Sequence, residues 1–395
     1  MERLAVSATH LNFDAHTPEE DIAAFVDAIK RSPERRGSLV ELLSERHPLY
    51  SGRGANASMR IRGYILASFE TVGLPGAALP YVLEELQTGR EAYLVAAAAK
   101  AIRGLADPPD EAARYLLKAV DNVTYVDDVV TFDEYRPTWP LLNSTTALAE
   151  ICLTLALFGR RAATALPQLV TMRDDAASFS EATRASVARA IDSISRAQDE
   201  PTDGSSATTC ACCAPQVVEI ERSRIESVGR NNAAVPMDVE FEDQEERRLT
   251  YGDFFADKPS VAAFFYTRCT NPNKCSLTIT KLGRLQCAIA DAGMKGHIRT
   301  AAITYDPAFD LPSRLRAYAK NRGMSFGHDD RALRTTAGFP ALSDYFDLGV
   351  NFGQAVVNRH RIELFVLDQR GRIAERFTRL QWDVTDVLKA AAAQT

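Results

Sequence analysis

The sequence predicts an all-α region followed by an α/β region, with a polar linker between them. Helical periodicity without a strand pattern fills the first half of the chain, and a Pro-, Gly- and Ser-containing stretch follows it. Apolar runs suited to buried strands then alternate with helical segments. Because 395 residues are comfortable for two domains, we expect a helical domain over 1–197, a linker over 198–235 and an α/β domain over 236–395.

The nine expected helices of the first domain are separated by Gly, Pro and Asp breakers and lie near residues 17–31, 38–45, 56–72, 77–88, 91–105, 109–121, 144–158, 162–173 and 180–197. Two helix starts look alike, Ala78-Leu-Pro80 and Ala165-Leu-Pro167, and they stand 87 residues apart. This is about twice the period of HEAT-type helical pairs, roughly 40–47 residues. The region therefore resembles a short HEAT-like array, although a plain bundle of paired helices gives a similar pattern. Residues 122–142, rich in aromatic and acidic side chains, are expected to form a loop or insertion.

The second domain has a different pattern, in which expected strands and helices alternate. Strands are expected over 261–266, 298–305, 361–367 and 372–378, and helices over 276–292, 311–322, 338–347 and 384–392. A strand–helix–strand unit, then an antiparallel hairpin and a closing helix, is the order of a thioredoxin-like fold.

Composition excludes some functions. A net charge of −6 argues against a general nucleic-acid binder, which would carry a basic stripe. The most apolar stretch, 146–158, is shorter than the roughly 20 residues of a membrane span. Residues 1–14 lack the basic segment and apolar run of a secretory signal. We therefore expect a cytoplasmic protein without a membrane span or a nucleic-acid partner.

The seven cysteines are unevenly placed. Cys152 and Cys287 lie within helical segments and are expected to pack in the core. In a reducing compartment, clustered cysteines more often bind metal or carry out redox chemistry than form permanent bridges. The cluster Cys210, Cys212 and Cys213 follows the linker directly, and we expect it to supply accessory thiols.

The pair Cys269 and Cys275 carries the strongest chemical signal. Cys269 follows a buried strand, and Cys275 lies near the start of the next helix. Backbone N–H groups and the helix dipole favour a thiolate there, which is the reactive and metal-binding form. Such a pair suits either disulfide exchange or the ligation of a soft metal.

The segment Phe264-Phe-Tyr-Thr-Arg-Cys269 resembles the SCO/SenC copper-chaperone family. Further matches occur in order over about 160 residues, at 241–255, 304–312, 358–360 and 367–373. The resemblance implies a thioredoxin-like fold and a copper site formed by Cys269, Cys275 and His360. One feature departs from the family: five residues separate the cysteines instead of three, and Thr270 follows Cys269 where the family has a proline.

Two thiolates and one imidazole form a three-coordinate soft site. Thiolates favour Cu(I), and the histidine also admits Cu(II). Zinc requires a fourth ligand, which the Cys210 cluster can supply. The residues alone leave copper and zinc equal, and the resemblance favours copper. Asp306 and Asp310 are expected to cap the next helix and order a turn.

Three functions fit these patterns, and whether the protein is an enzyme stays open. The first is a metallochaperone that delivers copper to a recipient protein docked on the helical domain, since HEAT-like arrays form extended docking surfaces. The second is a thiol–disulfide oxidoreductase that uses Cys269 and Cys275, with the Cys210 cluster relaying electrons. The third is a pathway enzyme recruited from the SCO family.

Overall fold

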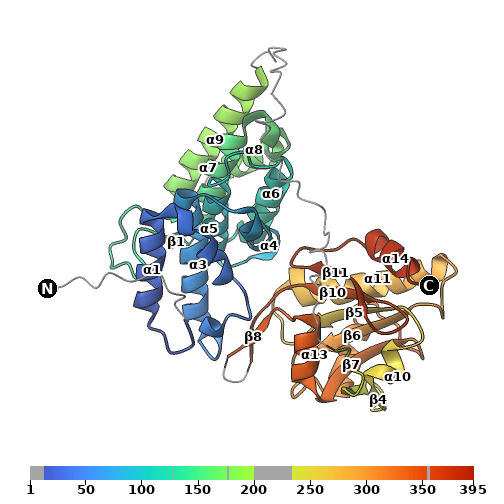
Figure 1. Cartoon of the computed structure of the whole chain (residues 1–395). Helices are drawn as coiled ribbons and strands as arrows, with labels where there is room; N and C mark the ends of the chain where they lie inside the picture. Colours follow the sequence, from blue (N-terminus) through green and yellow to red (C-terminus); the bar gives the residue numbers. More distant parts are fainter. Residues whose placement is uncertain (1–12, 127, 176–177, 200–233, 354–355) are drawn as a thin grey trace, which may run out of the picture.

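The computed structural model describes residues 13–126, 128–175, 178–199, 234–353 and 356–395. Its first part is helical, and its second part is a mixed sheet covered by helices on both faces (Figure 1). The helices of the first part are α1 (Glu19–Arg31), α2 (Gly37–Glu41), α3 (Ala55–Val72), α4 (Leu79–Thr88), α5 (Ala92–Ile102), α6 (Glu111–Val123), α7 (Ala147–Phe158), α8 (Leu166–Asp174) and α9 (Glu181–Asp199). The expected helical segments are confirmed.

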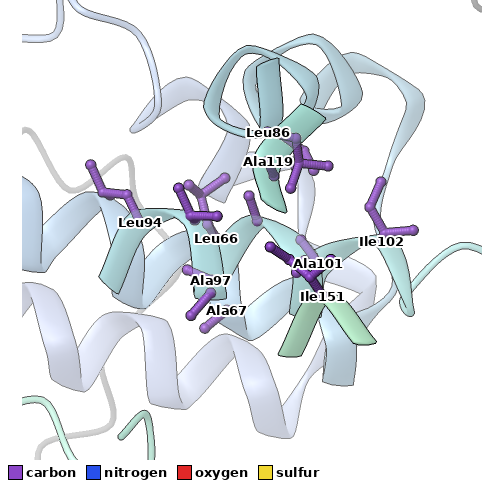
Figure 2. Packing of buried hydrophobic residues seen from close by; sticks show 14 of the residues in the cluster. Leu66, Ala67, Leu86, Leu94, Ala97, Ala101, Ile102, Ala119 and Ile151 are labelled. Carbon is purple, nitrogen blue, oxygen red and sulfur yellow. The ribbon is translucent and has the colours of Figure 1, made fainter. Parts of the chain in front are cut away.

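The helical part has one continuous core. Helices α3, α5, α7 and α9 pack side by side in chain order, and α4 packs on both α5 and α6. The alanines of α5 are buried, and Figure 2 shows Ala97 and Ala101 among larger side chains such as Leu66 and Ile151. Small side chains in the central helix let its neighbours approach closely at the density of a protein interior. The HEAT-like arrangement of these helices stays a prediction.

Residues 122–142, expected to form a loop or insertion, contain the short strand β1 (Val129–Val130), which pairs antiparallel with β2 (Thr145–Thr146) just beyond them. Strands of two residues are too short to show the alternation by which a sequence reveals a strand. Thr146 ends the pair and caps α7, because its side chain accepts a hydrogen bond from the Ala149 N–H at 3.1 Å.

The second part is built on a seven-stranded sheet in the order β11-β10-β5-β6-β7-β3-β4. Strands β5, β6 and β7 are parallel, and the other neighbours are antiparallel. The strands are β3 (Glu240–Asp243), β4 (Arg248–Thr250), β5 (Ser260–Phe265), β6 (Arg299–Thr304), β7 (Asp330–Ala337), β10 (Glu363–Leu367) and β11 (Ile373–Thr378), and a separate hairpin pairs β8 (Val350–Phe352) with β9 (Val357–His360). The helices are α10 (Tyr251–Phe255), α11 (Leu277–Asp291), α12 (Pro312–Lys320), α13 (Phe339–Phe346) and α14 (Val384–Ala392).

The central strand β5 is buried along its whole length. Its side chains alternate between two cores: Val261 and Phe265 pack with α11, α12 and α14, whereas Phe264 packs with α10 and α13. The expected thioredoxin-like order is observed, with a mixed sheet. Strand β7 was not predicted, because its half-polar sequence is partly exposed and lacks an apolar run.

The expected boundaries at 197 and 236 stay a prediction. Helix α9 continues to Asp199, and the linker with Cys210, Cys212 and Cys213 lies outside the described residues. Searched over the described residues, the structure has no helix long and apolar enough to cross a membrane.

The two parts contact each other through the β8–β9 hairpin, which reaches from the sheet toward the helices (Figure 1). The Gly52 N–H donates to the Phe352 carbonyl at 3.1 Å, and the Asn351 side chain donates to the Glu45 carbonyl at 3.2 Å. The Asn358 amide donates to the Arg53 carbonyl at 3.1 Å and lies 3.2 Å from the Ser58 hydroxyl.

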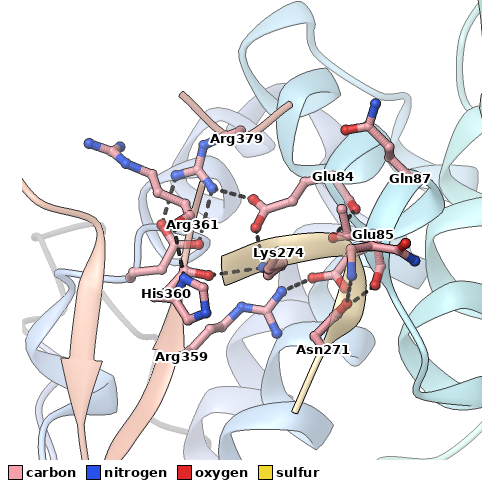
Figure 3. Close-up of polar contacts among 12 residues, drawn as sticks. Glu84, Glu85, Gln87, Asn271, Lys274, Arg359, His360, Arg361 and Arg379 are labelled. Carbon is pink, nitrogen blue, oxygen red and sulfur yellow. Dashed lines mark hydrogen bonds and ion pairs between the residues drawn. The ribbon is translucent and has the colours of Figure 1, made fainter. Parts of the chain in front are cut away.

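A buried ion-pair network joins the same two parts. Arg379, just after β11, contacts Glu45 at 2.7 Å and Glu84 at 2.9 Å (Figure 3). Lys274 contacts Glu84 at 2.7 Å, and the side chains of Glu45 and Glu84 are almost fully buried. Burial raises the pKa of Glu84, but the positive charges of Lys274 and Arg379 outweigh that effect and lower the pKa to about 2. The interface therefore depends on charged carboxylates.

This network predicts that the free energy of unfolding of the protein decreases in acid. The pKa of Glu84 is lower in the folded state than its ordinary value of 4.5, so its stabilisation is complete above pH 4.5 and is lost as the pH falls toward 2. At pH 7, Glu84→Gln should lower the free energy of unfolding by about 3 kcal/mol, since it leaves buried cations unpaired. Urea unfolding followed by circular dichroism measures the difference.

The difference between wild type and Glu84→Gln should shrink as the pH falls from about 4.5 toward 3. Glu181→Gln changes an exposed glutamate at the start of α9 and should stay within about 0.5 kcal/mol of wild type. A difference that is the same at pH 7 and pH 3 would contradict a charged Glu84 at the interface.

Candidate metal centre

The structure brings together the three residues that the sequence singled out. The ligand atoms of Cys269, Cys275 and His360 all lie within 4.8 Å of one another. The His360 Nε2 is 3.5 Å from the Cys269 Sγ and 3.6 Å from the Cys275 Sγ. Residues 91 and 85 positions apart in the chain therefore converge on one point.

Cys269 is placed by the turn that follows β5. The buried Asp310 carboxylate accepts hydrogen bonds from the Thr267 N–H at 3.0 Å and the Thr304 hydroxyl at 2.5 Å, and also from the Thr267 hydroxyl. Asp306 forms an ion pair with Arg268 at 2.5 Å. Both aspartates thus order the segment that leads to Cys269.

The expectation that Asp306 and Asp310 cap the next helix is wrong. The N-cap of α12 is Leu311, and no side chain caps it. The carboxylate of Asp310 already accepts three donors from the ends of β5 and β6, so it is directed toward the sheet and away from α12.

Cys275 lies in a short irregular helical turn, η6 (Pro272–Ser276), that leads into α11. The Asn271 side chain begins this turn by accepting a hydrogen bond from the Asn273 N–H at 2.9 Å. Lys274 departs from helical geometry, with φ −112° and ψ −110°. The kink accommodates the long loop between the cysteines and leaves Cys275 only 2% exposed.

His360 ends β9 and is held between two tyrosines. Its ring centroid is 5.2 Å from that of Tyr266, edge to face, and 5.7 Å from that of Tyr305. The Nδ1 atom is 3.0 Å from the Arg361 carbonyl oxygen, which can only accept a hydrogen bond. Nδ1 therefore carries a proton, and Nε2 faces the two sulfurs.

The two cysteines have different protonation states. A hydrogen bond from the Cys275 thiol lowers the pKa of Cys269 to about 3, against the effect of burial, and the neighbouring His360 adds to the lowering. Burial, together with the charge on Cys269, raises the pKa of Cys275 well above its ordinary value. Without a metal, the pair is one thiolate and one thiol, and binding of a metal must displace the Cys275 proton.

The donor set suits a soft metal. Two sulfurs and one imidazole nitrogen match Cu(I), which prefers thiolates, and the imidazole also suits Cu(II). Zinc structural sites have four ligands, and the cluster found among the described residues has three. The Cys210 cluster, expected as a source of accessory thiols, lies outside the described residues.

The other two cysteines among the described residues, Cys152 and Cys287, are not part of this cluster. Cys152 is buried as expected, and burial raises its pKa to about 12. The expectation that Cys287 packs in the core is wrong, because its side chain is exposed. Leu285 and Ile289 are buried on α11, and a residue two positions from each of them points to the opposite side of the helix.

Residues of the helical part hold the cysteine loop, and sequence reasoning missed them. The Lys274 ammonium donates to Glu84 at 2.7 Å and to the His360 carbonyl at 2.9 Å (Figure 3). The Asn271 amide donates to the Thr88 carbonyl at 2.7 Å. The signal available was weak: Glu84 and Glu85 interrupt the apolar side chains of α4, and buried acids require partners.

The assignment of Cys269 as the thiolate predicts how the rate of its alkylation depends on pH. In reduced, metal-free protein, alkylation of Cys269 by iodoacetamide should change little in rate between pH 5 and pH 8, because a pKa of about 3 leaves it ionised throughout. Cys275→Ser removes the thiol that donates to Cys269 and should slow the reaction at the acidic end. Mass spectrometry of the labelled peptides measures both rates, with exposed Cys287 as the internal control for the reagent. A Cys269 rate that rises tenfold per pH unit over this range contradicts the assignment.

Comparisons with known proteins agree with the resemblance seen in the sequence. Residues 228–393 match the model of the SCO1/SenC family. None of the curated proteins compared with the chain matches it. Similar solved structures include an SCO1/SenC family lipoprotein from Bacillus anthracis, at 18% identity, 40% of this chain, 96% of that chain and a TM-score of 0.35.

Two further structures contain copper. ScoI from Bradyrhizobium japonicum with copper bound is 18% identical over 41% of this chain and 100% of that chain, with a TM-score of 0.33. Yeast Sco1 with copper bound is 20% identical over 40% of this chain and 87% of that chain, with a TM-score of 0.32. The expected resemblance is confirmed: residues 228–393 resemble the SCO1/SenC family.

Proposed function

We propose that this protein holds copper through Cys269, Cys275 and His360 and passes it to a partner protein. The convergence of two sulfurs and one imidazole nitrogen within 4.8 Å carries the proposal. The softness of the donors and the SCO1/SenC resemblance support copper over other metals. Two cysteine sulfurs favour Cu(I) as the form held, and the histidine makes Cu(II) accessible.

The chain's own residues prepare the centre for the metal. Asp310 orders the approach to Cys269, and the Arg361 carbonyl sets the orientation of the His360 ring. Lys274 ties the cysteine loop to the His360 backbone. A centre whose ligands are held in this way loses little conformational entropy when it binds a metal.

We further propose that the recipient docks on the helical part. Four large apolar side chains between α6 and α7 are exposed: Tyr125, Val129, Trp139 and Leu142. Tyr125 is 99% exposed, and its neighbour Val126 lines the cavity that reaches Cys269. Exposed aromatic and aliphatic groups close together in the chain are typical of protein-binding surfaces. The nearness of Tyr125 to this cavity supports the docking site.

A thiol–disulfide oxidoreductase is the second candidate, and the unequal protonation of the cysteines favours it. The Cys269 thiolate attacks one sulfur of a substrate disulfide, which forms a mixed disulfide and releases one substrate thiolate. Cys275, on losing its proton to that thiolate, attacks the Cys269 Sγ and releases the second substrate sulfur as a thiolate. The substrate is then reduced, and the protein carries a Cys269–Cys275 disulfide.

Copper binding tests the first proposal. Reduced full-length protein is titrated with Cu(I) in the presence of a competing chelator, as wild type and as Cys269→Ser, Cys275→Ser and His360→Ala. Each substitution should lower the affinity by at least about tenfold, because even outer residues of metal sites contribute that much. Cys287→Ser, which changes an exposed thiol outside the cluster, should bind like wild type.

Wild type that binds Cu(I) no more tightly than a Cys269→Ser/Cys275→Ser double variant would overturn the copper proposal. Unchanged copper binding in His360→Ala, together with rapid exchange with a small disulfide, would favour the oxidoreductase.

A further inference from the structure

The candidate metal centre opens into a cavity between the two parts of the protein. The cavity has a volume of about 500 Å³. Ala55, Asn56 and Met59 of α3 line one side, and Tyr266, Cys269 and His360 line the other. Neither part forms this cavity alone, so it exists only while the two parts are docked.

Access to the centre from this cavity is directional. Cys269 and His360 line it, whereas Cys275 does not and is only 2% exposed. Cys269 is partly exposed. A molecule that enters the cavity therefore meets the sulfur of Cys269 first, with the imidazole beside it.

The cavity walls are held by buried contacts. Arg359 pairs with Glu85 across the interface, and Lys274 pairs with Glu84 (Figure 3). Asn271, which also lines the cavity, donates to the Thr88 carbonyl at 2.7 Å. Separating the walls would break these buried ion pairs and hydrogen bonds. The width of the cavity is thus a fixed property of the docked protein.

Size limits what can enter. Small-molecule sites typically have volumes of about 300–1,000 Å³, and this cavity lies within that range. A folded protein needs about 800 Å² of surface on each partner for a stable contact, which a hollow of this size does not offer. The lining combines apolar Met59, Leu94 and Val126 with polar Asn56 and Arg90, which suits a compact molecule of mixed polarity.

We propose that this cavity is the loading route of the metal centre and that its ligand is a low-molecular-weight thiol carrying Cu(I). The inference rests on the proposed function. A soft sulfur donor is the kind of ligand that keeps Cu(I) in solution and exchanges it with another sulfur. In the exchange, copper–sulfur bonds form to Cys269 and Cys275 and the copper–sulfur bond to the carrier breaks. The Cys275 proton leaves with the carrier as its thiol, and copper stays Cu(I) throughout.

Filling the cavity tests this route. Ala55→Trp adds a large side chain from the α3 wall, and Ala106→Trp, the matched control, changes another exposed alanine that lines a separate hollow. Reduced full-length proteins are mixed with the Cu(I)–glutathione complex, and the rise of copper–thiolate absorbance is followed by stopped flow. Loading of Ala55→Trp should be slower by about tenfold or more, which corresponds to about 1.4 kcal/mol of added barrier. Ala106→Trp should load at the wild-type rate.

A second readout does not involve copper. In metal-free protein, Ala55→Trp should slow the labelling of Cys269 by a maleimide the size of glutathione more than labelling by iodoacetamide. If Ala55→Trp does not fold, Asn56→Trp narrows the same wall. The three donor residues are unchanged in these variants. The Cu(I) affinity measured by chelator competition therefore distinguishes a blocked route, which leaves the affinity at the wild-type value, from a damaged centre, which lowers it.

Three outcomes are distinct. Loading and labelling of Ala55→Trp at wild-type rates would overturn the cavity route, even where copper binds tightly at equilibrium. Faster loading of wild type by a folded copper-carrying protein than by the thiol complex would overturn the choice of ligand. Failure of wild type to bind Cu(I) at equilibrium would overturn the proposed function. In that case, size-selective labelling of Cys269 would still show whether the cavity leads to this residue.

Discussion

The docking of the two parts of the protein depends on ion pairs that involve buried carboxylates at their interface. Glu84 has no exposed surface, and its partners Lys274 and Arg379 both come from the sheet-containing part. An ionised carboxylate left unpaired in such a place costs several kcal/mol. Docking must therefore bring Lys274 and Arg379 against Glu84 as this carboxylate becomes buried. Since Lys274 directly precedes Cys275, docking and the geometry of the candidate metal centre are coupled.

This coupling gives a physical reason for the long cysteine loop. The five residues between Cys269 and Cys275 include Asn271, Asn273 and Lys274, and each contacts the helical part. A loop with three intervening residues has fewer side chains available for such contacts. The longer loop thus supplies contacts to the helical part, and the sulfurs still converge on His360.

The sequence predicted what depends on local patterns. Periodicity revealed the helices, and the apolar run that ends at Phe265 revealed the central strand and hence the position of Cys269. It did not predict the roles of Glu84 or Asp310, because their partners lie 190 and 43 positions away and no periodicity records such contacts. Cys287 was misplaced for a simpler reason: apolar neighbours two positions away lie on the other side of a helix.

The buried ion pairs between the two parts also affect how copper could be transferred to another protein. Cys275 and His360 are almost fully buried, and Cys269 is only partly exposed. Separation of the two parts would widen the approach to Cys269 and His360, which line the cavity between them. If the broken ion pairs cost about 4 kcal/mol, roughly one molecule in a thousand is open at any time. A recipient that binds the open form more tightly supplies that free energy itself. On the proposed function, release of copper would then depend on the arrival of its recipient.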